Sequence, residues 1–263
     1  MNSFLPVLLG LLLLGGCGAS AAQPAPTAVP APVATAAPTS TATPVPTPAP
    51  TPAPPLAGRV ICVDPGHGVT DQRGSEAISP LSSKTKAKYV SGTAGRYQTE
   101  EQLNLSVGLK LRDALTAQGA TVVMTRETHE AAVSNIERAA IANGSAEVCV
   151  RIHADGSTSA AAHGLSVLIP AGELLGTPSI AEESARLGQL MADETCARTG
   201  AKALGTIQRT DLTAFNWSQI PVVLLEMGFM TNADEDAALA TDAYQQQLVD
   251  GMAAALVTWY QGR

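Results

Sequence analysis

The chain has 263 residues and a formal net charge of -7 at pH 7. This acidic balance argues against a nucleic-acid partner and against electrostatic attraction to anionic polymers of the cell envelope. The first 58 residues contain no Asp, Glu, Lys, Arg or His, so all charge lies in residues 59–263, which have the length of one domain.

The N-terminal segment has the pattern of an export signal. Residues 4–14 form an apolar run that is too short to span a membrane and suits a signal-peptide core. The Leu14-Gly15-Gly16-Cys17 sequence that follows resembles the lipobox of bacterial lipoproteins, although the usual basic residues before the apolar run are missing. The resemblance implies a lipid on Cys17 and a membrane anchor. The alternative is cleavage elsewhere, with Cys17 discarded.

The Pro, Ala and Thr content of the next segment predicts an extended linker, because it offers too little apolar bulk for a core. We therefore expect three parts. They are a signal peptide over residues 1–17, a linker over residues 18–58 and a folded domain over residues 59–263.

A buried strand is predicted to deliver a histidine at the start of this domain. Residues 60–68, VICVDPGHG, form an apolar run that ends at Asp64 and Pro65, and they hold His67 between two glycines. Such a histidine stays accessible, as a metal ligand or a general base requires. Residues 69–98 show no periodicity and predict a long loop with a local excess of basic residues, Arg73 among them.

The next element is predicted to be a helix over residues 100–118. A capping-box pattern precedes a helical stripe of leucine and valine. Glu100 continues this stripe inward, whereas Glu101 aligns with Arg112 toward solvent. An acidic residue in a first turn also complements the helix dipole, so Glu100 by itself has two explanations.

Further strands and helices alternate along the chain. Strands are expected at residues 120–125, with Arg126 at the end, and at residues 147–152, which deliver His153. Later elements are a strand within residues 164–169, a helix over 179–198, a short strand over 203–210, a strand over 221–227 and a helix over 242–260. Phe215 and Trp217 are predicted to pack in the core, with a ledge for substrate as the alternative. This order predicts a single α/β domain with a mostly parallel or mixed twisted sheet of about six strands and helices on both faces.

Two histidines and two carboxylates are candidates to meet in this fold. Sites in open α/β sheets lie at the carboxyl ends of strands, where we expect His67 and His153. Glu226 follows four apolar residues in a buried strand, which needs a partner, a proton or a metal, with pairing to an arginine as the structural alternative. Two imidazoles and one carboxylate are a standard ligand set for catalytic zinc, and no HExxH motif is present.

The remaining cysteines, Cys62, Cys149 and Cys196, lack CxxC spacing and are predicted to be buried free thiols, although a pairing among them is left open.

Five segments in order now identify a family. VICVDPGHG, TEEQLNLSVGLKLRDAL, TVVMTRET, VRIHADGS and PVVLLEMGFMTN resemble the zinc-dependent N-acetylmuramoyl-L-alanine amidases (amidase type 3) over residues 59–260. The resemblance implies that His67, Glu100 and His153 bind zinc and that Glu226 is the catalytic carboxylate. The implied substrate is peptidoglycan, cut between N-acetylmuramic acid and L-alanine, with Arg73 or Arg126 holding peptide carboxylates.

Two other functions fit these residues. One is a lipid-anchored peptidoglycan-binding protein with little turnover, and the other is a zinc peptidase or deacetylase that acts on a different amide. For all three we expect a monomer that is exported to the cell envelope.

Overall fold

The computed structural model describes residues 25, 27–28, 30–31, 33, 53–68 and 73–263. Cys17 lies outside these residues. All helices and strands of the described chain belong to one unit, Thr51–Arg263. No helix in the described ranges is long and apolar enough to cross a membrane.

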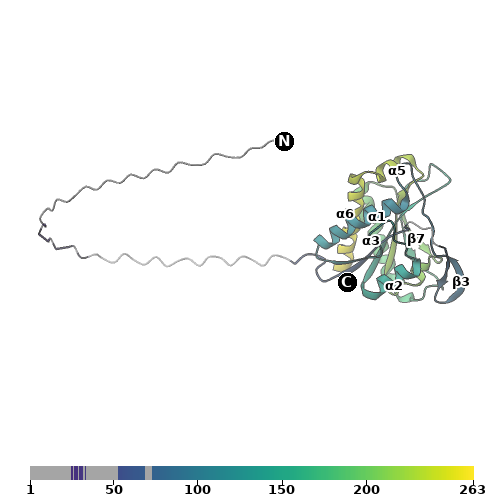
Figure 1. The fold of residues 1–263 in the computed structure, drawn as a ribbon, viewed down its shortest axis with the longest axis horizontal. Helices are drawn as coiled ribbons and strands as arrows, with labels where there is room; N and C mark the ends of the chain where they lie inside the picture. The colour runs from purple at the N-terminus through teal and green to yellow at the C-terminus, as the bar shows by residue number, and fades with distance from the viewer. Residues whose placement is uncertain (1–24, 26, 29, 32, 34–52, 69–72) are drawn as a thin grey trace, which may run out of the picture. The chain divides into compact units, whose positions relative to one another are not determined.

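The strands are β1 (Val60–Pro65), β2 (Ser75–Ser79), β3 (Ser82–Ala87), β4 (Thr121–Met124), β5 (Val148–Asp155), β6 (Leu165–Pro170), β7 (Ala203–Arg209) and β8 (Val222–Phe229). The helices are α1 (Glu100–Ala117), α2 (Asn135–Ser145), α3 (Ala181–Thr199), α4 (Thr213–Asn216), α5 (Ala233–Leu239) and α6 (Asp242–Gln261), with a 3-10 turn at Pro178–Ile180. Figure 1 shows their arrangement.

Six strands form one mixed sheet in the order β4-β1-β5-β8-β6-β7. Strands β4, β1, β5 and β8 run parallel, β6 is antiparallel to β8, and β7 is parallel to β6. The central strands are buried on both faces because each face carries apolar side chains into its own core. On β1, Ile61 and Val63 belong to the larger core, whereas Cys62 points into the smaller one.

Helices cover both faces of the sheet, as the sequence predicts. Helices α1, α3 and α6 carry the larger core, and α2 and α4 pack on the other face. On α1, the expected stripe of Leu103, Val107, Leu111 and Leu115 is fully buried. Leu56, which lies in the expected linker, is also fully buried in the larger core, so packing begins before Arg59.

The loop expected over residues 69–98 is the main difference from the sequence prediction. Residues 75–87 form an antiparallel hairpin, β2–β3, in a sheet of its own. Trp217 Nε1 donates to the carbonyl of Ala77 at 3.0 Å, and Asn216 Nδ2 donates to the carbonyl of Ile78 at 2.9 Å. The hairpin is therefore fastened to α4 and the residue after it, more than a hundred residues away in sequence.

Two smaller expectations also change. The helix predicted from residue 179 begins as the 3-10 turn at Pro178–Ile180, and α3 proper follows. Glu101 does not pair with Arg112. Its carboxylate instead contacts His129 Nδ1 at 2.9 Å, while Arg112 binds Asp113 and Glu127. Cys62 and Cys149 are buried free thiols, and Cys196 is a half-buried one.

Candidate active site

The turn after β1 presents His67 in an unusual backbone conformation. His67 has a φ of +59°, in the left-handed region that a residue with a side chain rarely adopts. Two buried arginines hold this turn through its carbonyls. Arg138 donates to the carbonyl of His67, and Arg126 donates to those of Pro65 at 2.9 Å and Gly66 at 2.8 Å. These bonds offset the cost of the strained conformation.

Three predicted ligands meet at this turn. His67 Nε2 lies 3.0 Å from Glu100 Oε1, and His153 Nδ1 lies 3.0 Å from the same oxygen. The two imidazole rings contact edge to face with their centroids 4.8 Å apart. The topology explains the meeting, because β1 and β5 are adjacent parallel strands that both end here, and Glu100 opens α1 beside them. The three side chains could hold one metal ion.

The surroundings of these side chains fit a metal site. Ligand atoms held by one zinc ion at ~2.1 Å in a tetrahedron are roughly 3.4 Å apart, close to the separations found here. His67 Nδ1 lies 2.7 Å from the carbonyl of Val90, the usual arrangement by which a backbone oxygen orients a ligating histidine.

Glu100 is fixed by several donors. Its Oε2 accepts from the backbone N–H of Thr93 at 2.9 Å, and its Oε1 accepts from the N–H of Ala154 at 3.2 Å and from Asn104 Nδ2 at 3.3 Å. Asn104, one helical turn after Glu100, also donates to the carbonyl of Gly66. A buried carboxylate with this many donors stays ionised and in place.

The protonation states also suit a metal. Burial lowers the pKa of His153 to about 4, so its imidazole is neutral at neutral pH. Burial alone would raise the pKa of Glu100, but hydrogen bonds to His153 and His67 outweigh it and lower the pKa below its usual range. Neutral imidazole and ionised carboxylate are the forms that bind a metal.

Two glycines leave room for this cluster. A Cβ on Gly66 would lie 2.2 Å from Cε1 and Nε2 of His153, and a Cβ on Gly92 would lie 2.2 Å from Glu100 Oε2. Any larger residue would displace a ligand, since real Cβ contacts are not this short. The second glycine lies in the segment after the hairpin, where no local sequence signal marked it.

Glu226 lies beside the cluster on β8, in register with His153 on β5. Its Oε2 is buried and has no hydrogen-bond partner among the described residues. Burial raises the pKa of Glu226 well above its usual range, and the nearby Glu100 and Asp155 charges add to the effect. The structural alternative, a direct ion pair with an arginine, is not seen in the described chain.

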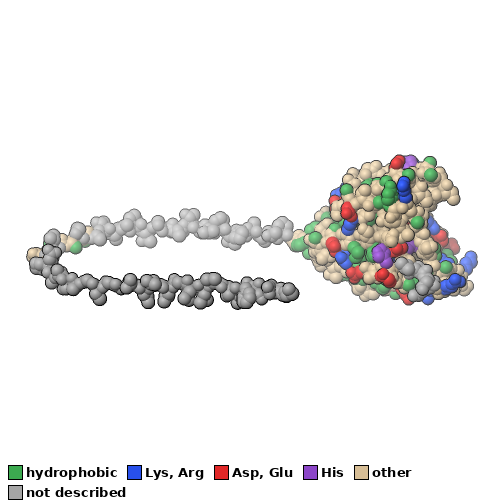
Figure 2. Space-filling model, turned by 45° about the horizontal axis from the view of Figure 1, so that its top comes forward, with side chains coloured by type: hydrophobic (Ala, Val, Ile, Leu, Met, Phe, Trp, Pro, Cys, Tyr) green, Lys and Arg blue, Asp and Glu red, His purple; other side chains and the backbone are tan. Residues whose placement is uncertain are grey.

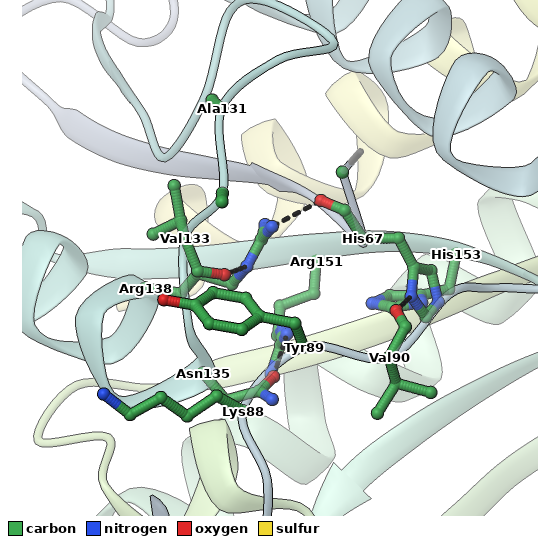
Figure 3. A pocket seen from close by; sticks show the side chains of 12 residues that line it. His67, Lys88, Tyr89, Val90, Ala131, Val133, Asn135, Arg138, Arg151 and His153 are labelled. Atoms are coloured by element: carbon green, nitrogen blue, oxygen red, sulfur yellow. Dashed lines mark hydrogen bonds between the residues drawn. The ribbon is translucent and has the colours of Figure 1, made fainter. Parts of the chain in front are cut away.

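The cluster opens into hollows on two sides. A groove of about 500 Å³ contains Glu226 together with Glu100, His67 and His153. On the other side, His67 and His153 border a small cavity of about 60 Å³ between the end of the hairpin and α2, shown in Figure 3. A third hollow of about 380 Å³ adjoins this cavity and is lined by residues of β3, of β8 and of the start of α4.

The structure does not bring the two predicted substrate-binding arginines into these hollows. Arg73 is exposed, and it is not among the residues that line them. The Arg126 side chain is fully buried, and its guanidinium is occupied by the carbonyls of Pro65, Gly66 and Glu101. Arg126 supports the His67 turn instead.

Sequence reasoning missed the parts that support the ligands. Arg138 lies near the start of α2, and it donates to the backbone carbonyls of Pro65 and His67, contacts that no local pattern reveals. Asp64, whose role the sequence left open, binds Arg151 Nε at 2.7 Å and also pairs with Arg138. An aspartate inside an apolar strand is itself a signal for such a buried partner.

Comparisons with known proteins identify the family of this chain. The sequence model of the N-acetylmuramoyl-L-alanine amidase family matches residues 61–258. An N-acetylmuramoyl-L-alanine amidase of Mycobacterium tuberculosis is 31% identical over 221 residues, which cover 79% of this chain and 90% of that protein. The amidase LytC of Bacillus subtilis is 25% identical over 209 residues, covering 79% of this chain but only 36% of LytC.

Solved structures show the same fold. The crystal structure of the amidase Ami1 of Mycobacterium smegmatis superimposes with a TM-score of 0.72 at 28% identity, and the match covers 79% of this chain and 99% of that one. The family match runs from β1 into α6 and includes the four candidate site residues, His67, Glu100, His153 and Glu226. The chain therefore belongs to the N-acetylmuramoyl-L-alanine amidase family.

Proposed function

We propose that this chain hydrolyses the amide between N-acetylmuramic acid and L-alanine in peptidoglycan. The observation that carries the proposal is the meeting of His67, Glu100, His153 and Glu226 at one groove. Membership of the family and relatives that are named amidases support the choice of substrate. A structural or purely binding role would not need a carboxylate of raised pKa beside such a cluster.

We further propose that the resident metal is zinc, held by His67, Glu100 and His153. Two neutral imidazoles and one carboxylate are the donor set of many catalytic zinc sites. When bound there, zinc would supply a Lewis acid for the scissile carbonyl and for water.

Glu226 supplies the proton transfers in this mechanism. Its carboxylate takes a proton from the attacking water and returns it to the amine of L-alanine as the C–N bond breaks. A carboxyl group with a raised pKa suits both steps near neutral pH, because it can hold the proton between them. His67 and His153 have no part in these transfers, because each gives one ring nitrogen to the metal cluster and the other nitrogen of His67 contacts the carbonyl of Val90.

The test replaces Glu226 by Gln and measures zinc content and hydrolysis of purified muropeptides. We expect zinc to remain and the rate to fall by about 10²- to 10⁴-fold, the usual contribution of one acid–base residue. Glu173→Gln, an exposed carboxylate outside the groove, is the matched control and should leave the rate unchanged. Full turnover by Glu226→Gln would refute the assignment.

Product analysis separates this function from the two alternatives. A new peptide with an N-terminal L-alanine identifies the amidase. Acetate or a cut within the peptide would identify a deacetylase or a peptidase, and binding without products would identify a wall-binding protein.

We propose export to the cell envelope, with the protein anchored to the membrane through a lipid on Cys17. The linker of residues 18–58 would then let the catalytic domain, a monomer, reach the wall. Relatives that are named cell-wall amidases support the location. Metabolic labelling with a radioactive fatty acid tests the anchor, because Cys17→Ala should abolish the label and release the protein from the membrane fraction.

A further inference from the structure

The two sides of the His67–His153 pair carry opposite charge. The groove that contains Glu226 is also lined by Glu100 and Asp155, and no lysine or arginine of the described chain lines it. The hollows on the other side are lined by Lys86, Lys88, Arg138 and Arg151, and no described aspartate or glutamate lines them. His67 and His153 border both sides, so the change of sign occurs across the reacting centre.

Neither of these two lysines forms an ion pair with a carboxylate of the described chain, so both can bind an anion. Lys86 lies in β3 and Lys88 lies just after it, with one residue between them. Among the described lysines, only Lys110 forms a side-chain ion pair. Lys86 Nζ donates only to the backbone carbonyl of Asp211, at 3.3 Å. The Asp211 carboxylate itself is held by Arg209 at 2.8 and 2.9 Å.

The buried arginines behind the cavity add positive charge. Arg138 and Arg151 share one carboxylate, that of Asp64, which leaves the trio with a net charge of +1. Figure 3 shows Arg138, Arg151 and Tyr89 grouped on one side of His67 and His153. Glu76 of the same hairpin lines neither hollow, and its carboxylate accepts from the N–H groups of Asn135 and Ile136 at the start of α2.

The surface view agrees with this distribution. Figure 2 shows Lys and Arg side chains gathered at the lower right edge of the folded unit, where Figure 1 places β3. The domain as a whole is acidic, so a local basic cluster beside the site calls for an anionic ligand.

We propose that the basic side, built on Lys86 and Lys88, binds carboxylates of the stem peptide, and that the uncharged sugar lies in the groove on the Glu226 side. This inference rests on the proposed function. The substrate has the matching asymmetry. Its sugar carries hydroxyl and acetamido groups, whereas its second amino acid, a γ-linked D-glutamate, offers a free α-carboxylate unless that group is amidated.

The dimensions allow this orientation. Two residues of extended peptide reach about 7 Å, and the basic hollows begin at the imidazoles themselves. On the opposite side, Ser157, Thr158 and Thr231 line the groove with hydroxyl groups suited to a sugar. A substrate bound the other way round would place its carboxylate against Glu100, Asp155 and Glu226, which like-charge repulsion disfavours.

The test uses two disaccharide-tetrapeptides that differ only at the second residue, which is either D-glutamate or D-isoglutamine. The intact protein should cleave the glutamate form with the lower KM. Lys88→Gln and the double variant Lys86→Gln/Lys88→Gln should raise that KM by about three- to tenfold with little change in kcat, as for loss of a partly screened ion pair. They should leave the KM of the isoglutamine form unchanged.

Two further measurements sharpen this test. Lys84→Gln, on the same hairpin but exposed and outside every hollow at the site, is the control and should change neither KM. Calorimetric binding of both substrates to the Glu226→Gln protein should show the same preference without turnover.

The results of these experiments distinguish failure of the proposed substrate orientation from failure of the proposed amidase function. Equal KM and Kd for the two substrates, unchanged in the lysine variants, would overturn the orientation while leaving the amidase function intact. Failure of the zinc-loaded protein to cleave either substrate would overturn the proposed function, and a preference for the glutamate form in the binding measurement would still support the basic subsite.

Discussion

Gly66 is the position where the smallest change should do the most specific damage. A methyl group added there would lie 2.2 Å from two ring atoms of His153 and 2.7 Å from a third. Carbon atoms in contact prefer about 3.5 Å, so the ring would have to move by about 1.3 Å. The φ of Gly66 lies outside the left-handed region, so alanine fits the backbone and the collision alone is tested.

The magnitude follows from what holds the ring. His153 is largely buried and is fixed by Glu100 at 3.0 Å, so a shift of this size breaks the contact that defines the ligand set. Overpacking a site of this kind costs about 1–3 kcal/mol of folding free energy. Disturbing the orientation of a ligand costs about 10- to 100-fold in metal affinity, and we expect Gly66→Ala to lie at the upper end.

The assay measures zinc retained after dialysis, the rate of muropeptide hydrolysis and the unfolding midpoint. Gly144→Ala is the control, because a Cβ at this position meets nothing within 4 Å. The change replaces a glycine in the exposed last turn of α2 by alanine. That control should be stabilised by about 0.5–1 kcal/mol and keep full activity. Wild-type zinc content and rate in a folded Gly66→Ala protein would refute the geometry assigned to His153.

Three further changes test other parts of the fold. Arg126→Met should lower the free energy of unfolding by about 3 kcal/mol in guanidinium denaturation, because it strands backbone carbonyls of the His67 turn, and an unchanged midpoint would contradict that role. Burial would raise the pKa of Asp64, but its paired arginines outweigh burial and hold that pKa below the usual range. The ionised Asp64 therefore stabilises the fold above the unfolded pKa of about 3.9, and this stabilisation is lost as the pH falls below that value. Asp64→Asn should therefore cost about 3–5 kcal/mol at pH 7 and flatten the loss of stability between about pH 4 and 2. Alkylation of the native protein, read by mass spectrometry, should modify Cys196 before Cys62 and Cys149, which are buried; equal rates would show that the sheet opens readily.

Much of the fold can be predicted because its signals are local. Buried strands such as β5 and β8 read as apolar runs, and α1 has both a capping-box pattern and a periodic stripe. The hairpin β2–β3 lacks such signals, since its strands are rich in Ser, Thr and Lys and half of their residues face solvent. Its position depends on Asn216 and Trp217, and no local pattern can report contacts across that distance in sequence.

The candidate site also contains residues whose roles the sequence predicts and residues whose roles it does not. His67 lies just after β1 and His153 lies near the end of β5, both at the carboxyl edge of the sheet, so topology alone predicts that they approach each other. The buried stripe of α1 turns Glu100 toward them. The role expected of Arg126 did not follow, because a cation near a strand end can turn outward to substrate or inward to backbone carbonyls. Packing decides between the two, and the buried guanidinium of Arg126 shows that it turned inward.

The two carboxylates of the groove show how one fold gives like groups unlike roles. Glu100 and Glu226 are both withdrawn from water, yet their pKa values move in opposite directions. Glu100 receives hydrogen bonds from both histidines and from backbone N–H groups, so its anion is the stable form. Glu226 has a bare buried oxygen and faces the charges of Glu100 and Asp155, so its neutral form is favoured. Hydrogen bonding therefore separates two buried carboxylates of one groove: the bonded carboxylate keeps the anionic form that a metal ligand needs, and the unbonded one keeps the proton affinity that proton transfer needs.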